Sequence, residues 1–277
     1  MTREDPSPHA PGTSTPAAGG ARIDLNADLG ESFGAWRMGD DAALLAQVTS
    51  ANIACGFHAG DPAIMQQTVA LAVAAGVAIG AHVALPDLQG FGRREMRISP
   101  AEAHAMTLYQ LGALGAFARA AGSRVSHLKP HGALYNMAAR DAALADAIAA
   151  AARAFDPGLL LVGLAGSELP RAGERAGLPV AHEGFADRRY ASDGTLLPRH
   201  EAGAVIDDPQ EAIAQALRMA VAGEVATCGG VRALRIDTLC VHGDHPGAVA
   251  AARALRTALA GAGVVVAAVA PAAGTRA

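Results

Sequence analysis

Lysine is almost absent from this sequence, which contains only one, Lys129, among 22 Lys and Arg residues. Arginine supplies the ordinary surface charge, so a lone ammonium indicates a position that needs a compact cation with three donors. Chance survival of a single lysine is the alternative interpretation. Because Pro130 follows it, the phosphate-binding pattern G-x-x-x-x-G-K-[ST] cannot occur, and a nucleotide would have to bind in another way.

Cysteines and aromatic residues are also scarce. Cys55, Cys228 and Cys240 lie too far apart for a C-x-x-C motif or a disulfide framework, which predicts a reduced, cytoplasmic protein. Aromatic residues make up 4% of the chain and its net charge is −4. The sequence has no basic patch with interleaved aromatic residues, so no nucleic-acid partner is expected.

Long apolar runs are missing as well. Charged residues, histidine or glycine interrupt every alanine-rich stretch before the roughly 18 residues that a membrane span needs, so no membrane association is expected. Residues 1–20 are rich in Pro, Ser, Thr, Gly and Ala without an apolar signal-peptide core, which predicts a disordered tail. No linker-like composition interrupts residues 21–270, which predicts a single domain followed by a flexible tail at 271–277.

Short apolar strands alternate with helical segments along the whole chain. This alternation indicates a parallel sheet with helical crossovers, hence an α/β fold that is either a barrel or a doubly wound sheet. The predicted strands are residues 22–26, 50–54, 77–81, 125–128, 159–163, 180–183, 238–241 and 264–267.

Capping residues mark several helix starts. Asp61 and Asp208 each precede a proline, and Ser99 with Glu102 forms a capping box. Beyond Asn136 an alanine-rich helix is expected to continue to about residue 155. The polar segment 184–207 is long enough to predict a lid or a binding loop.

Polar residues follow nearly every predicted strand. In an open sheet such residues would gather at one switch point, whereas in a barrel the carboxyl ends of all strands meet at one mouth. The pattern therefore favours a barrel with its site at that mouth. These residues are Asn26, Asp28, Glu31, His58, His82, Lys129, His131, Glu183, His242, Asp244 and His245.

Carboxylates beside histidines and a lysine supply general acids and bases. Each single residue has a structural interpretation: a histidine can be a satisfied core group, and Asn26, Asp61 or Asp244 can cap a helix or brace a turn. The coincidence of five polar strand ends favours a real site. The register of Asp24, which decides whether it points into the barrel, stays open.

The same residues could bind a metal. His58, His82 and His131 with Asp28 would form a His/carboxylate site that activates water, and Asp28, His58 and His82 are the candidate ligands. No two of the histidines have the H-x-x-x-H spacing of a helical metal motif, so the signal for a transition metal is weak.

Two pairs of adjacent arginines lie in predicted loops. Residues 93 and 94 form one pair and residues 188 and 189 the other. Both pairs are interpreted as solvated loop charges, although either could clamp a carboxylate or a phosphate.

Five longer motifs, in order along residues 22–270, resemble the LamB/YcsF family. They are Ile23–Gly34, Ser50–Pro62, Lys129–Asn136, Phe185–Tyr190 and Val241–Pro246. The resemblance implies a distorted (β/α) barrel of about seven parallel strands, like those of glycoside hydrolases and polysaccharide deacetylases. The sequence departs from the family pattern at residues 83–85, which read V-A-L, and at residue 245, where histidine replaces the usual asparagine.

The resemblance also implies a soluble component of a three-subunit 5-oxoprolinase, which opens 5-oxo-L-proline to L-glutamate with hydrolysis of ATP. Subunits B and C would be the partners, and ATP, with Mg²⁺, the co-substrate. The alternatives are a metal-dependent deacetylase acting on an N-acyl group and a non-catalytic binding subunit.

Within this hypothesis Lys129 and His131 stabilise charge on lactam or phosphoryl oxygens. Asp28 or Glu31, with His58, positions a nucleophile or moves protons. The predicted catalytic residues are Asn26, Asp28, Glu31, His58, His82, Lys129 and His131. The predicted substrate- or nucleotide-binding residues are Asp61, Asn136, Glu183, Asp187, Arg188, His242 and Asp244.

Overall fold

The computed structural model describes residues 21–241 and 247–269. The predicted tails at 1–20 and 271–277 lie outside the described residues, and so do His242, Asp244 and His245. Within the described part of the chain, no helix combines the length and the apolar character needed to cross a membrane.

Seven parallel strands close into a ring, which confirms the predicted barrel. Their order is β1-β2-β3-β4-β5-β6-β9, and β9 pairs with both β6 and β1. The two-residue β10 (Val265–Val266) pairs with the start of β1 beside this ring. The ring strands are β1 (Arg22–Leu29), β2 (Ser50–Ala54), β3 (Ala78–Val83), β4 (Val125–Pro130), β5 (Leu160–Leu164), β6 (Val180–Phe185) and β9 (Thr238–Val241).

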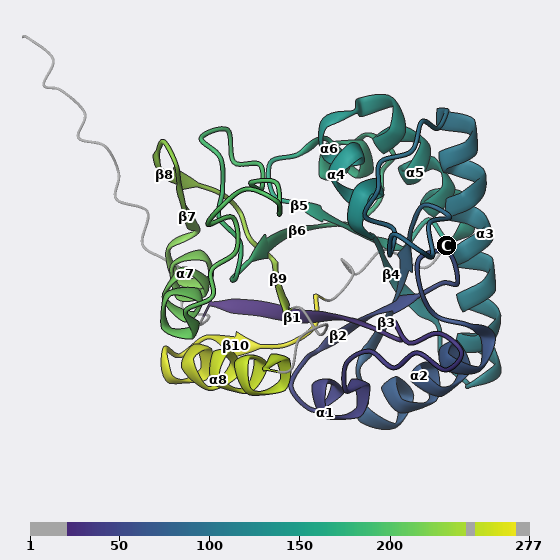
Figure 1. Ribbon diagram of the computed structural model, residues 1–277, viewed down its shortest axis with the longest axis horizontal. Helices are drawn as coiled ribbons and strands as arrows, with labels where there is room; N and C mark the ends of the chain where they lie inside the picture. Colours follow the sequence, from purple (N-terminus) through teal and green to yellow (C-terminus); the bar gives the residue numbers. More distant parts are fainter. Residues whose placement is uncertain (1–20, 242–246, 270–277) are drawn as a thin grey trace, which may run out of the picture.

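Helices surround the strands on the outside of the barrel (Figure 1). They are α1 (Asp41–Leu45), α2 (Pro62–Ala75), α3 (Pro100–Ala120), α4 (Gly132–Arg140), α5 (Ala142–Phe155), α6 (Glu168–Arg175), α7 (Pro209–Ala222) and α8 (Ala248–Gly261). The predicted caps are confirmed: Asp61 and Asp208 accept backbone N–H groups at the starts of α2 and α7, and Ser99 with Glu102 closes a capping box on α3.

The prediction of a single helix from Asn136 to about residue 155 is wrong. A helix already begins at Gly132, directly after β4, and it ends at Arg140. Asp141 then caps a second helix, α5, by accepting the N–H groups of residues 143 and 144. The early start of α4 matters because it carries side chains next to the end of β4 into the barrel.

The predicted ends of several strands are also wrong. β1 continues to Leu29, β3 to Val83, β4 to Pro130 and β6 to Phe185, two or three residues beyond the predicted limits. Polar residues expected to follow these strands therefore lie on them, because the barrel interior is itself polar and strand alternation continues through them. The residues concerned are Asp28, His82 and Lys129.

β1 shows this alternation most clearly. Ile23, Leu25, Ala27 and Leu29 belong to the hydrophobic core between the strands and the helices. The residues between them, 24, 26 and 28, hydrogen-bond to side chains of other ring strands and so point into the barrel. The register of Asp24, left open by the sequence, is thus inward.

A small lobe covers one side of the barrel. It combines the hairpin β7 (Glu224–Thr227) and β8 (Gly230–Ala233) with the predicted lid segment. Tyr190, 1% exposed, lies in that segment and forms an isolated bridge with Thr227. Its hydroxyl accepts the N–H of Phe185 at 2.8 Å. The segment is therefore built into the fold by its own core residue.

Gly80 gives the interior one of its special packing positions. It lies beside His127 in the register of β3 and β4. A Cβ atom on Gly80 would stand 1.9 Å from Nε2 of His127, far inside van der Waals contact. The imidazole therefore fills the space that a side chain at residue 80 would occupy.

We predict that Gly80→Ala lowers the free energy of unfolding by about 2–3 kcal/mol, because the added methyl group overpacks the interior and displaces His127. Denaturant titration measures this. The matched control is Gly112→Ala on the exposed face of α3, where a Cβ meets nothing within 4 Å and removal of a helical glycine should stabilise the protein by about 0.5–1 kcal/mol. Equal effects of the two substitutions would contradict the packing argument.

Candidate functional site

Lys129 lies at the centre of the barrel between two carboxylates. Its Nζ is 2.8 Å from Oε1 of Glu183 on β6 and 3.0 Å from Oδ1 of Asp28 on β1, and the lysine side chain is 3% exposed. Burial alone would lower the pKa of Lys129, but attraction by the neighbouring anions outweighs it and holds the pKa well above its usual value. The ammonium is therefore a permanent cation fixed between two acids.

Cys240 on β9 is a further neighbour of this ammonium. Its Sγ is 3.1 Å from Nζ of Lys129. Burial raises the pKa of the Cys240 thiol well above its ordinary value. The residue thus stays a neutral thiol that accepts a hydrogen bond in the barrel interior.

Glu183 connects the lysine to α4. Its Oε2 accepts the hydroxyl of Tyr135 at 2.7 Å, and its Oε1 accepts Nδ2 of Asn26 at 3.0 Å. Burial raises the pKa of Tyr135 well above its usual value, and Glu183 raises it further, so the phenol remains a donor. The sequence prediction missed Tyr135, although its position one helical turn after His131 could have identified it.

Below the lysine, an amide network holds the carboxylate of Asp28. Nδ2 of Asn52 donates to Oδ1 of Asp28 at 2.8 Å and to Oδ1 of Asn26 at 2.7 Å. Oδ1 of Asn52 in turn accepts Nε2 of His127 at 2.9 Å. Neither Asn52 nor His127 was predicted, yet His127 is two residues before Lys129 and so points inward with it.

The deepest polar group is Asp24, which is 3% exposed. Burial raises its pKa, and hydroxyl donors work in the opposite direction. This carboxyl group closes the end of the barrel away from the histidines. Its donors are Thr49, Ser50 and Thr238.

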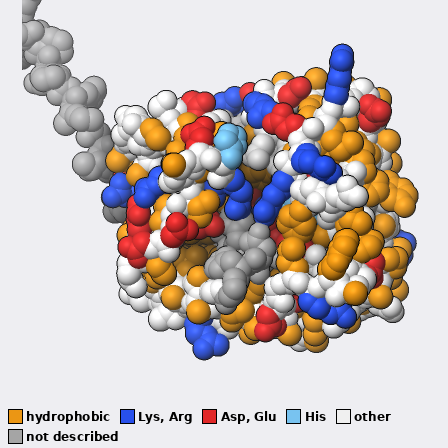
Figure 2. Space-filling model, viewed as in Figure 1, with side chains coloured by type: hydrophobic (Ala, Val, Ile, Leu, Met, Phe, Trp, Pro, Cys, Tyr) orange, Lys and Arg blue, Asp and Glu red, His pale blue; other side chains and the backbone are white. Residues whose placement is uncertain are grey.

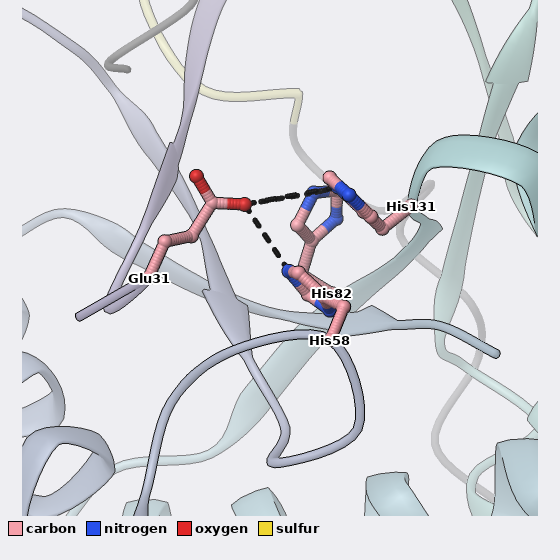
Figure 3. A group of neighbouring side chains, drawn as sticks. All are labelled: Glu31, His58, His82 and His131. Carbon is pink, nitrogen blue, oxygen red and sulfur yellow. Dashed lines mark hydrogen bonds and ion pairs between the residues drawn. The ribbon is translucent and has the colours of Figure 1, made fainter. Parts of the chain in front are cut away.

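Three imidazoles and one carboxylate meet at the mouth of the barrel (Figure 3). Glu31 follows β1, His58 follows β2, His82 is on β3 and His131 follows β4. One nitrogen or oxygen of each lies within 4.8 Å of the others, and all four residues are buried. The arrangement could hold a metal ion. It places Glu31 in the group for which the sequence suggested Asp28.

The carboxylate of Glu31 points at the rings. Its Oε1 is 3.1 Å from Nε2 of His58, 3.7 Å from Nδ1 of His131 and 4.0 Å from Nε2 of His82. The rings of His58 and His131 stack with centroids 3.9 Å apart. The sequence therefore identified all four residues, but not the way they group.

Backbone carbonyls hold two of the rings from behind. Nδ1 of His82 is 3.0 Å from the carbonyl oxygen of Lys129, and Nε2 of His131 is 2.8 Å from that of Phe91. Nδ1 of His58, in contrast, is buried without a hydrogen-bond partner among the described residues. Burial lowers the pKa of His58 and of His131 well below the usual value, and the neighbouring imidazoles add to this.

Gly92 lets two of these histidines approach each other. Its φ of +64° is in the left-handed region, and a Cβ there would lie 2.8 Å from Cβ of His58 and 2.9 Å from Cδ2 of His131. A side chain at this position would push the rings apart.

Asp28 links the lysine and the histidines. Its Oδ1 contacts Lys129, while its Oδ2 is 3.3 Å from Nε2 of His82. A charge or proton change at the histidines therefore acts on the same carboxylate that holds the ammonium. Together these groups can stabilise an oxyanion, move a proton and orient water.

Other predicted binding residues lie away from this centre. Asp61 caps α2 and also accepts the N–H of Gly34 at 2.8 Å, so it braces the loop after β1. Asn136 is exposed on α4, and no described hydrogen bond joins it to the site. Asp187 lines an apolar cavity of about 70 Å³ between β9, α7 and α8.

The two arginine pairs behave differently from each other and from the prediction. Arg94 pairs with Asp87, and Arg189 pairs with Glu211 at 2.7 Å on the surface. The interpretation of Arg188 as a solvated charge is wrong, because it is only 5% exposed. It is enclosed because its loop folds over its own core.

Arg93 lies between Arg188 and the histidines. Its guanidinium stands 4.9 Å from the ring of Phe91, which packs edge-on against His58 and His131. Burial lowers the pKa of Arg188 to about 10, and repulsion from Arg199 and Arg93 contributes. Figure 2 shows Lys and Arg side chains gathered near the middle of the same face. The surroundings of Arg188 thus favour an anion.

The family departure at residues 83–85 does not reach the site directly. Val83, Ala84 and Leu85 are fully buried. Gln110 of α3 holds the backbone of Ala84 through both its N–H and its carbonyl oxygen. This segment is core structure behind the histidines.

Comparison with known proteins agrees with the motifs. A family model described as LamB/YcsF family matches residues 23–274, which confirms the resemblance drawn from the sequence. A protein of Methylococcus capsulatus, named as the A subunit of 5-oxoprolinase, is 64% identical over 247 residues, covering 89% of this chain and 95% of that protein. A Bacillus subtilis protein of the same name is 55% identical over 249 residues, covering 90% and 97%.

A solved structure shares the fold. The lactam utilization protein from Thermus thermophilus superposes with a TM-score of 0.84 at 52% sequence identity, covering 89% of this chain and 99% of that one.

His127 gives a prediction for pH dependence. Burial lowers its pKa to about 3 in the folded protein, and Lys129 and His82 lower it further, so it stays neutral while an unfolded histidine gains a proton near pH 6.5. Its contribution to stability is present above pH 6.5 and is lost as the pH falls from there toward 3. The free energy of unfolding should therefore lose up to about 1.4 kcal/mol per pH unit from this group.

His127→Gln, whose amide can still donate to Asn52, should weaken that slope between about pH 6 and pH 4, within the window set by these values. Urea titrations at several pH values measure it. Identical slopes for the two proteins would show that His127 is protonated in the folded state.

Proposed function

Because the chain belongs to the LamB/YcsF family, we propose that it takes part in the ATP-dependent opening of 5-oxo-L-proline to L-glutamate. Its relatives share a name as the A subunit of 5-oxoprolinase, and the Thermus protein is named for lactam utilization; both names support this substrate. The ring opened is a five-membered cyclic amide, and the chain acts as a hydrolase on it.

The observation that carries the proposal is the buried ammonium of Lys129 between Asp28 and Glu183. A lactam is resonance-stabilised, so opening it requires stabilisation of negative charge on its oxygen or on a phosphoryl group attached there. A preorganised cation in a water-poor interior supplies that stabilisation without reorganisation. Nearby, His131 can act on the same oxygens, and Glu31 or Asp28 with His58 can move protons.

ATP enters this scheme as the phosphoryl donor, with Mg²⁺. Transfer of the terminal phosphoryl group to the lactam oxygen activates the ring carbon, which water then attacks. The C–N bond breaks, the ring nitrogen takes up a proton, and a second water releases phosphate from the resulting acyl phosphate. We propose that subunits B and C share these steps, since the relatives are named as one subunit of several.

Arg188 is our proposed binding group for the carboxylate of 5-oxoproline. It is buried, and its Nε has no hydrogen-bond partner among the described residues. One of its terminal nitrogens donates to the carbonyl oxygen of Leu197, which fixes the side chain. A planar guanidinium with free donors matches a carboxylate in shape and charge.

The setting we propose is the cytoplasm, where ATP is available. All three cysteines are free, and two of them are buried, which agrees with a reducing compartment.

A metal-dependent hydrolysis of an N-acyl group is the second candidate, and the Glu31 and histidine cluster favours it. The two candidates differ in their need for ATP. Co-expression of the chain with subunits B and C, followed by measurement of glutamate released from 5-oxoproline with and without ATP, separates them. Release only with ATP supports the first candidate, whereas no release under either condition rejects it.

We predict that Lys129→Met in the assembled enzyme lowers kcat for ATP-dependent glutamate release by on the order of 100–1,000-fold, because the charge-stabilising cation is lost. Arg119→Met, at the exposed end of α3, is the control for loss of one cation. Circular dichroism verifies folding. Full activity of the Lys129 variant would leave the chain with a non-catalytic binding role.

For Arg188 we expect the conservative change Arg188→Lys to raise KM for 5-oxoproline about tenfold or more with a smaller change in kcat, because a bidentate contact becomes a single one. Arg189→Lys is the matched control, since that neighbour pairs with Glu211 on the surface. A change in kcat alone, or equal behaviour of both variants, would count against carboxylate binding by Arg188.

A further inference from the structure

His82 and His131 face each other in a way that two neutral imidazoles cannot satisfy. Nδ1 of His82 lies on the carbonyl oxygen of Lys129, and Nε2 of His131 lies on that of Phe91. A carbonyl oxygen only accepts, so each of these nitrogens carries the hydrogen. The other nitrogen of each ring is then an unprotonated lone pair.

Those two lone pairs point at one another. Nε2 of His82 and Nδ1 of His131 are 2.9 Å apart. Without a positive charge between them the contact is repulsive. A proton would relieve it by making one buried ring a cation, whereas a metal ion would accept both lone pairs together.

We infer that Glu31, His58, His82 and His131 bind one divalent transition-metal ion at the mouth of the barrel. The site is independent of the proposed substrate, because it follows from the ligand geometry alone. A tetrahedral ion with bonds of about 2.1 Å separates its ligand atoms by about 3.4 Å. Four separations between ligand atoms of the group, 2.9, 3.1, 3.7 and 4.0 Å, lie on both sides of that value.

The surroundings of the rings match those of metal-binding histidines. Such histidines characteristically donate their second N–H to a backbone carbonyl or a carboxylate, which fixes the tautomer. Both His82 and His131 do so. Structural histidines need no such pairing of outer carbonyls with converging inner lone pairs.

The donor set also selects the class of ion. Three imidazole nitrogens and one carboxylate suit Zn²⁺ and neighbouring first-row ions, whereas Mg²⁺ and Ca²⁺ prefer oxygen donors. The ion would therefore differ from the Mg²⁺ that accompanies ATP. Oδ2 of Asp28, 3.3 Å from Nε2 of His82, stands beside the ion with its other oxygen on Lys129. An ion here can polarise a carbonyl or acidify a bound water next to that carboxylate.

The test is metal binding by the purified full chain, without substrate or partners. Metals are removed with a chelator, and Zn²⁺ and then Co²⁺ are added while calorimetry and the visible absorption of Co²⁺ are recorded. We expect one ion per chain and a Co²⁺ spectrum of low coordination number. The melting temperature should rise with Zn²⁺ concentration, because the ion binds only the folded state.

His82→Gln, His131→Gln and Glu31→Gln should each weaken binding by on the order of 100-fold or more, since even outer contacts of a metal site are worth about 10–100-fold. His104→Gln, on α3, is the matched control and should bind as the unaltered chain does. Circular dichroism of the metal-free variants verifies folding, and Glu31→Gln keeps the test valid if a histidine variant fails to fold.

Absence of stoichiometric binding would overturn the inference and leave a proton between the two rings. Binding of equal strength in all variants would overturn it as well, because the ion would then lie elsewhere. Neither result bears on ATP-dependent glutamate release, which is measured separately.

Discussion

The interaction on which the interior depends is the ion pair network around Lys129. A buried ammonium is costly unless anions accompany it, and here Asp28 and Glu183 meet it from different strands. The ring must therefore be closed for the charges to balance: β1, β4 and β6 come together only in a barrel. Fold and site thus share one electrostatic requirement.

This requirement explains why the interior is polar almost throughout its length. Asp24 is held by hydroxyl groups at one end, Asn52 and His127 connect the middle, and the histidines form the mouth. Hydrophobic burial is left to the outer surface of the strands and the helices packed on it. The barrel resembles a sleeve of apolar contacts around a hydrogen-bonded axis, in which each polar residue restricts the rotamers of the next.

The sequence predicted the parts of this arrangement that depend on local pattern. The unique lysine and the polar residues near strand ends identified the barrel and most of the site, because parallel strands have to deliver such groups to one place. Tyr135 was missed because α4 begins at Gly132, and no local signal separates that start from a loop. The stacking of His58 on His131 depends on the backbone of Gly92, which comes from a third segment. The burial of Arg188 likewise depends on how residues 186–208 fold over Tyr190.

The direct passage from β4 into α4 has an evolutionary consequence. Within seven residues the chain supplies Lys129 to the ammonium centre, His131 to the imidazole group and Tyr135 to Glu183. A single insertion or deletion in this stretch would rotate the helix by about 100° and misplace all three groups at once. Length polymorphism should therefore be forbidden here, while segment 186–208 can grow or shrink between species without disturbing the catalytic axis.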